Sequence, residues 1–220
     1  METKASRSFK AFVIDLDGTL LDTTKDIGLA LGKTLNHTFS DSQTDRFVGR
    51  GLKNAVKAAT EELGLRDADL DALTRRLIDF YREVPVLHTK PYPGAVELLT
   101  DLNKKGLPVC IYSNKEQDLT ETILGICFKD IKFSMIVGMH GKYEPKPSSQ
   151  AIDAFLSKVG VDKRAALYIG DSDVDFKTAS QAGMNYRILT CGTRSKKSLL
   201  EAGVPKDFLI DSLFEIKDLI

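Results

Sequence analysis

The sequence predicts an α/β protein in which a doubly wound parallel sheet carries a smaller group of helices, inserted after its first strand. Three features of the 220-residue chain predict this fold class. Short apolar runs without polar alternation recur along the chain, as in strands that are buried on both faces. Helical patterns separate most of these runs. One long segment breaks the alternation, because it holds three helical patterns in succession and no convincing strand.

The alternating part of the chain begins with a compact apolar run at 11–14, which stops abruptly at an aspartate. Similar runs follow, so we expect strands at 11–14, 109–112, 135–137, 166–169 and 186–189. The stretches between them predict helices at 95–104, 116–124, 148–159, 174–182 and 196–202. Because strands and helices alternate, the strands are expected to pair in parallel.

The helical insertion is the segment from residue 22 to residue 87. Apolar side chains recur there with helical spacing around 27–35, 52–63 and 70–81. Gly49 and Gly51 flank Arg50 and favour a loop between two of these helices. Pro91 and Pro93 mark the return to the sheet. We therefore divide the chain into a sheet domain of residues 1–21 plus 88–220 and a helical domain of residues 22–87.

The composition excludes several classes of protein. With 42% hydrophobic and 28% charged residues, the chain is expected to be soluble and globular. Lysine plus arginine and aspartate plus glutamate each number 31, so no basic excess favours nucleic acid. Residues 1–10 show no secretory signal and no apolar run is long enough to span a membrane, so we expect a cytoplasmic protein. The sequence leaves open whether it is a monomer or a homodimer. The three scattered cysteines predict neither a disulfide framework nor a zinc site.

The strongest motif is Asp15-Leu16-Asp17-Gly18-Thr19-Leu20, directly after the first apolar run. Ligands bind at the carboxyl ends of strands in parallel sheets, and two carboxylates there repel each other unless a cation or proton compensates them. Mg²⁺, which takes a few carboxylates plus water and phosphate oxygens, is a suitable cation. Gly18 and Thr19 could present backbone N–H groups to a phosphate. The alternative is a turn that only closes the strand.

A second acidic cluster, Gly170-Asp171-Ser172-Asp173-Val174-Asp175, also follows an apolar run and opens a predicted helix. Asp171 stands at the strand end and is the better candidate for a metal ligand. Asp175 comes one helical turn later, so we expect it to orient the metal ligand Asp171 without contacting the ion itself. A helix N-cap is the alternative, although a single aspartate would be enough for that purpose.

Two other places carry weaker signals. Ser113 and Asn114 follow the strand run at 109–112 and offer a hydroxyl and an amide to an anion. Lys146 lies between two prolines, which fix the backbone on both sides and would aim its ammonium group. Taken singly, each has an ordinary interpretation, a turn for the Ser-Asn pair and a solvated loop for the lysine.

Together these four pieces resemble, in order, the motifs of the haloacid dehalogenase superfamily of phosphoryl-transfer enzymes. Asp15-x-Asp17-Gly-Thr is similar to the first motif, Ser113 to the second, Lys146 to the third and Gly170-Asp171-x-x-x-Asp175 to the fourth. The resemblance covers essentially the whole chain beyond the first ten residues. It implies a Rossmann-like core, and the helical insertion resembles the small helical cap of that family.

The resemblance also implies a role for each residue. Asp15 would attack phosphorus to form an aspartyl phosphate, and Asp17 would act first as acid and then as base. Mg²⁺ would be held by Asp15, Asp171 and the backbone carbonyl of Asp17. Family members that cleave carbon–halogen bonds lack the acid at Asp17, so its presence favours a phosphatase. The residues implied to bind the phosphate are Gly18, Thr19, Ser113, Asn114 and Lys146.

The helical insertion would select the substrate. Its segment Val48-Gly49-Arg50-Gly51-Leu52 resembles the cap loop of phosphoglycolate phosphatases, so 2-phosphoglycolate is the leading candidate among small phosphorylated metabolites. Arg50 and Lys53 could neutralise a second anionic group, or they could be ordinary surface cations. Other substrates stay open, namely those of a sugar-phosphate phosphatase, a pyrophosphatase or a β-phosphoglucomutase-like phosphomutase.

Two alternatives come from other functional classes. A phospho-accepting signalling receiver also combines clustered aspartates, a hydroxyl and a lysine on a parallel sheet, but the long helical insertion argues against it. An inactive binding module on the same fold is the other alternative. The presence of all the acids together with Lys146 disfavours it.

Overall fold

A computed structural model describes residues 8–220 of the protein, so the predicted lack of a secretory signal falls in part on residues 1–7, outside the described residues. Its centre is a six-stranded sheet in the order β5-β4-β1-β6-β7-β8, in which every neighbouring pair is parallel. The strands are β1 (Ala11–Ile14), β4 (Val109–Glu116), β5 (Met135–Met139), β6 (Ala166–Gly170), β7 (Asn185–Leu189) and β8 (Leu209–Ile210). The predicted parallel sheet is confirmed.

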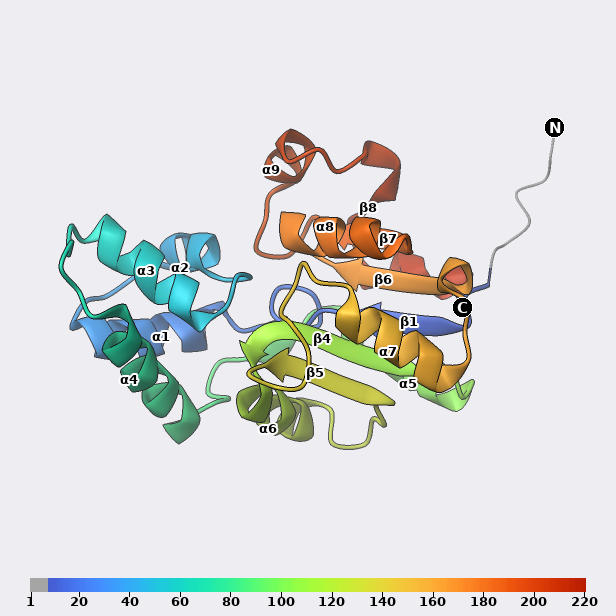
Figure 1. Ribbon diagram of the computed structural model, residues 1–220, viewed down its shortest axis with the longest axis horizontal. Coiled ribbons are helices and arrows are strands. Elements are labelled where there is room, and N and C mark those ends of the chain that lie inside the picture. The colour runs from blue at the N-terminus through green and yellow to red at the C-terminus, as the bar shows by residue number, and fades with distance from the viewer. Residues whose placement is uncertain (1–7) are drawn as a thin grey trace.

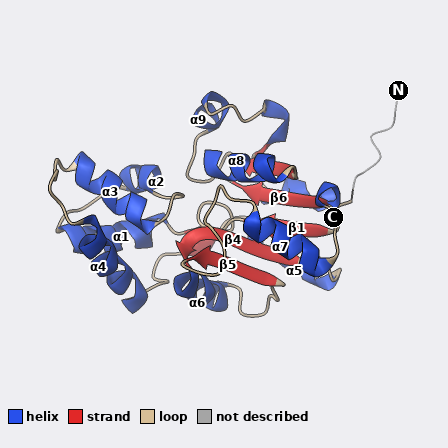
Figure 2. Cartoon of the chain, in the orientation of Figure 1, coloured by secondary structure: helices blue, strands red, loops and turns tan. Residues whose placement is uncertain are grey.

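Helices cover both faces of this sheet (Figure 2). Alternate side chains of β1 point to opposite faces, so Phe12 and Ile14 belong to one apolar cluster while Ala11 and Val13 belong to another. The first face is covered by α5 (Ala95–Lys104), α6 (Gln117–Cys127) and a 3₁₀ segment at Leu213–Leu219. The second is covered by α7 (Gln150–Val159) and α8 (Asp173–Ala182). Burial on both faces explains why the strands read as unbroken apolar runs.

The helical insertion forms a group of four helices to one side of the sheet (Figure 1). They are α1 (Thr24–Leu35), α2 (Asp41–Phe47), α3 (Leu52–Glu62) and α4 (Leu70–Glu83). Three of them were predicted, and α2 was not. Buried apolar side chains of α1, α3 and α4 form the inside of this group. Gly49 and Gly51 lie in the loop between α2 and α3, as the sequence predicts, and both have positive φ.

The two chain segments that join the helical insertion to the sheet pair with each other. β2 (Leu21–Asp22) and β3 (Lys90–Pro91) form a two-stranded antiparallel ribbon. Beside it the carboxylate of Asp26, on α1, accepts hydrogen bonds from the backbone N–H groups of Leu87, His88 and Thr89 at 2.8–3.0 Å. These contacts fix the entry and exit of the helical insertion relative to one another.

The remaining differences from the prediction lie at element ends and in short elements that the sequence pattern does not indicate. β4 extends to Glu116, and its register with β5 shifts between Tyr112 and Glu116. Three short elements after α9 (Lys196–Glu201) were not predicted: a 3₁₀ turn at Lys206–Phe208, the edge strand β8 and the 3₁₀ segment at Leu213–Leu219. A third short 3₁₀ turn covers Lys163–Ala165. Within residues 8–220, no helix has the length and apolar character needed to cross a membrane.

Candidate active site

The motifs meet at one edge of the sheet because their strands are neighbours. β1 lies between β4 and β6, and all three run in the same direction, so their carboxyl ends lie side by side. Asp15 follows β1, Asp171 follows β6, and Ser113 lies in the last half of β4. This is also the place where the chain switches from one side of β1 to the other. Such a switch point is where open α/β sheets bind ligands.

Lys146 is the centre of a buried charge cluster. Its Nζ atom lies 2.5 Å from Oδ1 of Asp15 and 2.8 Å from Oδ1 of Asp175. Burial alone would lower the pKa of Lys146, but the two carboxylates raise it above its usual value, so the side chain is a cation. Asp175 is further held by the hydroxyls of Tyr168, at 2.8 Å, and Ser172, at 2.5 Å. Lys146 is therefore aimed at Asp15 by a fixed anionic partner.

Asp171 is fully buried and held by a loop that the sequence did not single out. Its Oδ2 atom accepts hydrogen bonds from the backbone N–H of Thr193 at 2.7 Å and from the Thr193 hydroxyl at 2.6 Å. The hydroxyl of Thr19 lies 3.4 Å from Oδ1 of Asp171 and 3.3 Å from Oδ2 of Asp15, between the two acids. Gly18 has φ +87°, and a Cβ there would lie 2.4 Å from the Asp171 carboxylate. Only glycine fits beside this carboxylate.

The carboxylates of Asp15, Asp171 and Asp175 carry more charge than their surroundings compensate. One oxygen from each can be chosen so that all three lie within 4.8 Å of one another. Burial raises the pKa of Asp15 well above its usual value, and Asp175 and Asp171 add to the rise, while Lys146 opposes it. With all three ionised, the single ammonium of Lys146 leaves two negative charges uncompensated. A hard divalent cation with oxygen ligands fits this donor set.

Asp17 points to a second lysine. Oδ1 of Asp17 lies 2.8 Å from Nζ of Lys115 and accepts a 2.7 Å hydrogen bond from the hydroxyl of Thr23. Lys115 is 2% exposed and also donates to the hydroxyl of Tyr81, on α4, at 2.8 Å. Lys115 lies in the stretch between Tyr112 and Glu116 where the register of β4 with β5 shifts.

The groups predicted to bind phosphate are used in different ways. Ser113 is 2% exposed and its Oγ accepts from the backbone N–H of Lys115, which leaves its own proton to be donated. The Asn114 amide instead bonds the backbone N–H and C=O of Lys146, at 2.9 and 3.3 Å. The backbone N–H groups of Gly18 and Thr19 donate within their own turn, to the carbonyls of Leu21 and Leu16. Asn114 thus positions Lys146, and Thr19 reaches the acids through its hydroxyl.

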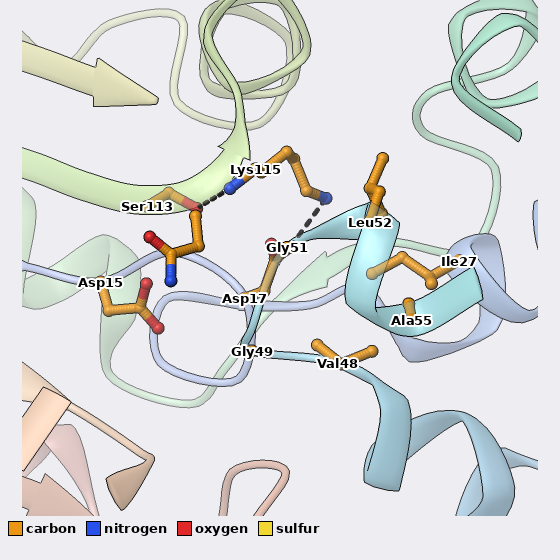
Figure 3. Close-up of a pocket in the computed structure, with 11 residues that line it drawn as sticks. Asp15, Asp17, Ile27, Val48, Gly49, Gly51, Leu52, Ala55, Ser113 and Lys115 are labelled. Carbon is orange, nitrogen blue, oxygen red and sulfur yellow. Dashed lines mark hydrogen bonds and ion pairs between the residues drawn. The ribbon is translucent and has the colours of Figure 1, made fainter. Parts of the chain in front are cut away.

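A small cavity lies between the acids and the helical insertion (Figure 3). Its volume of about 20 Å³ is roughly that of one water molecule. The sheet side is polar, with Asp15, Asp17, Ser113, Asn114 and Lys115. The facing side is apolar, formed by Ile27, Val48, Leu52 and Ala55, together with the backbone of Gly49 and Gly51. A cavity of this volume is too small to hold a phosphate ester.

Neither cation predicted to select the substrate lines this cavity. The guanidinium of Arg50 pairs with Asp173 at 3.2 Å and joins the helical insertion to the start of α8. Lys53 pairs with Asp71 at 2.6 Å within the helical insertion, where both side chains are more than half exposed. Arg50 lies near the site and Lys53 lies apart from it.

Lys115 and Thr193 are the site residues that sequence reasoning missed. Lys115 directly follows Ser113-Asn114, but a lysine at a strand end has the ordinary interpretation of a solvated side chain. Thr193 lies in a short polar stretch, 190–195, after β7. The only available signal was position, since β7 neighbours β6 and its carboxyl end opens onto the same sheet edge.

Comparison with known proteins places this site in a family. Residues 12–188 match the model of the haloacid dehalogenase-like hydrolases. A phosphoglycolate phosphatase of Aquifex aeolicus is 34% identical over 79% of this chain and 81% of its own length. That of Rhodospirillum rubrum is 32% identical over 83% and 80%, respectively.

Solved structures agree on the fold. A Haemophilus somnus protein described as a predicted phosphoglycolate phosphatase has a TM-score of 0.84 and 24% identity, over 98% of each chain. A haloacid dehalogenase-like family hydrolase of Streptococcus pneumoniae has a TM-score of 0.75 and 20% identity, over 95% of this chain and 97% of that chain. The family predicted from the four motifs is confirmed. The chain belongs to the haloacid dehalogenase-like hydrolases and is a phosphoric monoester hydrolase.

Proposed function

We propose that the protein is a Mg²⁺-dependent phosphatase that hydrolyses a small phosphate monoester through an aspartyl phosphate on Asp15, with 2-phosphoglycolate as the leading substrate. The observation that carries the proposal is the position of Asp15. Its carboxylate lies at the end of β1, beside the cation Lys146 and at the wall of the small cavity. An anionic nucleophile needs such cations around it to approach an anionic phosphate.

In the proposed reaction, a carboxylate oxygen of Asp15 forms a bond to phosphorus while the bond from phosphorus to the leaving oxygen breaks. Asp17 gives its proton to that oxygen, and an alcohol leaves. Asp17 then takes a proton from the water that attacks phosphorus, so that orthophosphate is released and Asp15 is restored. Proton transfers of this kind typically contribute about 10²–10⁴-fold to the rate. Lys146 and the Ser113 hydroxyl would stabilise charge on the phosphoryl oxygens.

The carboxylates of Asp15 and Asp171, with the backbone carbonyl of Asp17, would hold Mg²⁺. When bound, the ion would supply positive charge that offsets the nucleophile and the phosphate. The uncompensated charge of the buried acids supports this assignment. Asp175 would act indirectly, because its oxygens already accept from Lys146, Tyr168 and Ser172.

The preference for 2-phosphoglycolate is supported by the curated relatives, which are phosphoglycolate phosphatases, and by the small apolar wall of the cavity. We keep Arg50 as the cation that would meet the distal anion, because its partner Asp173 comes two residues after Asp171. The contact of Lys53 with Asp71 gives Lys53 no such support. We further propose that residues 22–87 act as a cap domain, in a cytoplasmic monomer or homodimer.

A panel of phosphate esters, assayed with and without Mg²⁺, tests this function. The panel contains 2-phosphoglycolate, sugar phosphates and pyrophosphate, and it records both orthophosphate and any isomerised sugar phosphate. We expect orthophosphate from 2-phosphoglycolate, dependent on Mg²⁺, and near-complete loss of turnover in Asp15→Asn without loss of folding. Isomerisation without orthophosphate would instead show a phosphomutase, and full activity of Asp15→Asn would exclude Asp15 as the nucleophile.

A further inference from the structure

Lys115 is a buried lysine whose two partners come from different parts of the molecule. Asp17 belongs to the turn after β1, whereas Tyr81 belongs to α4 of the helical insertion. The ammonium group also lies 4.5 Å from the centre of the Tyr81 ring. Lys115 is 2% exposed and Tyr81 is 1% exposed. A buried cation is costly unless it is paired and hydrogen-bonded, so both partners matter.

The same contacts fix the orientation of Asp17. Lys115 and the Thr23 hydroxyl both contact Oδ1 of Asp17, at 2.8 and 2.7 Å. Oδ2 is therefore the oxygen left for proton transfer at the cavity. A carboxylate held through one oxygen by a cation and a hydroxyl has little freedom to rotate. Asp17 and Lys115 both line the cavity, so this ion pair lies next to the proposed place of reaction (Figure 3).

Tyr81 makes the arrangement depend on the position of the helical insertion. Burial raises the pKa of Tyr81 to about 12, so its hydroxyl is neutral and accepts from Lys115. If α4 moves away from the sheet to admit substrate, Lys115 loses this acceptor and the aromatic ring together. Closure restores both, and at the same moment it closes the cavity around the acids.

We propose that Lys115 is a positioning residue for Asp17, and that Tyr81 completes this positioning only when the helical insertion closes on the sheet. The inference rests on the proposed function, in which Asp17 protonates the leaving oxygen. In this role Lys115 contacts Oδ1 of Asp17 and not the oxygen that would transfer the proton. It acts by holding one oxygen of Asp17, so its loss should mimic the loss of a well-placed acid.

The leaving group provides the test. An alkyl ester such as 2-phosphoglycolate needs protonation as it leaves, whereas p-nitrophenyl phosphate does not. The ratio kcat/KM reports the steps up to departure of the alcohol, so hydrolysis of the phosphoenzyme does not affect it. We expect Lys115→Met to lower kcat/KM about 10²-fold or more for 2-phosphoglycolate and less than about 10-fold for p-nitrophenyl phosphate. In the Asp17→Asn background, Lys115→Met should cause little further loss.

Tyr81→Phe keeps the ring and removes only the hydroxyl. We expect it to lower kcat/KM for 2-phosphoglycolate about 10-fold and to leave the aryl ester nearly unchanged. Lys142→Met and Tyr143→Phe are matched controls, because Lys142 is an exposed lysine 5.5 Å from the centre of the Tyr143 ring and neither lines the cavity. Both controls should stay within about 2-fold of the wild type for either ester.

Equal losses for the two esters in Lys115→Met and in Tyr81→Phe would overturn the proposal, because they would show a merely structural role. If Lys115→Met does not fold by circular dichroism, Tyr81→Phe alone decides. Asp17→Asn separates this inference from the proposed function. A selective loss in Asp17→Asn without one in the Lys115 and Tyr81 variants refutes only the inference, whereas no selectivity in Asp17→Asn refutes the acid role itself.

Discussion

The ammonium nitrogen of Lys146 lies 2.5 Å from a carboxylate oxygen of Asp15, although the two residues are 131 positions apart in the chain. The contact exists because β1 ends beside β4, and because the Asn114 amide of β4 holds the backbone of Lys146. Lys146 also bonds Asp175, which is fixed by Tyr168. The sheet thus brings a nucleophile and its counter-ion together from distant segments.

Replacing Lys146 should therefore harm both stability and activity. Lys146→Met leaves Asp15 and Asp175 buried without their cation, which typically costs about 3–5 kcal/mol of unfolding free energy. We also expect turnover to fall about 10²-fold or more. Urea denaturation and steady-state assays measure the two effects. Lys177→Met is the control, since Lys177 is half-exposed and pairs with Asp173, and it should cost less than about 1 kcal/mol. Similar costs for both variants would contradict this prediction.

Mg²⁺ affinity should fall as the pH drops through about 6. Burial raises the pKa of Asp171 to about 6 and Asp175 adds to the rise, although the bonds from Thr193 oppose it. Below that pH the proton occupies the carboxylate and competes with the metal. Calorimetric titration should show affinity falling about 10-fold per pH unit below 6. Thr193→Val, which removes one of the opposing bonds, should move this fall to higher pH. Constant affinity from about pH 7.5 to about pH 5 would contradict the assignment of Asp171 as a ligand.

The loop between α2 and α3 should tolerate no side chain at Gly51. A Cβ there would lie 2.8 Å from Sδ of Met139 and 3.1 Å from the carbonyl oxygen of Asn114, both in the sheet. Gly51→Ala should therefore hold the helical insertion away from the sheet and lower kcat/KM about 10-fold. Gly64→Ala is a matched control, since Gly64 also has positive φ but no atom lies within 4 Å of its Cβ position. Both variants should lose about 1 kcal/mol of stability, and only Gly51→Ala should lose activity.

Much of the fold is readable from the sequence because its strands are buried on both faces. The runs at 11–14 and 166–169 match β1 and β6 to within one residue. Helix α2 was not predicted, because Asp41–Phe47 is mostly polar and shows no apolar stripe. Its only local signal is the capping box formed by Ser40 and Gln43. A short helix without an apolar stripe forms through its contacts with neighbouring elements, so the pattern of a single sequence does not predict it.

Site residues at strand ends are predictable from the sequence, whereas contacts between segments that are distant in the sequence are not. Asp15 and Asp171 follow strands, so their meeting at one sheet edge follows from topology. The partnership of Lys115 with Tyr81 depends on how α4 packs against the sheet, which no local pattern encodes. From the sequence, Arg50 could face a substrate anion or be an ordinary surface cation, and in the structure it pairs with Asp173.

Asp26 should contribute a pH-dependent part of the stability. Burial alone would raise its pKa, but the Thr89 hydroxyl and the backbone N–H groups of Leu87, Thr89 and His88 together lower it. Its stabilising effect is therefore full above the pKa of about 3.9 in the unfolded chain and is lost as the pH falls below it. Asp26→Asn should cost about 2 kcal/mol near pH 7 in urea denaturation. The difference from the wild type should shrink below pH 4, and a difference that grows there would refute this account.

The most direct test of the central claim is chemical capture of the phosphoryl group on Asp15. Borohydride reduces an aspartyl phosphate to homoserine, which peptide mass spectrometry locates in the sequence. The wild-type enzyme would be quenched within one turnover of 2-phosphoglycolate with Mg²⁺. Asp17→Asn, which slows hydrolysis of the phosphoenzyme, would be quenched within one turnover of p-nitrophenyl phosphate, whose leaving group needs no proton. We predict homoserine at position 15, absent without substrate. Homoserine at another aspartate, or none at position 15 while orthophosphate is released in the same samples, would contradict the proposed mechanism.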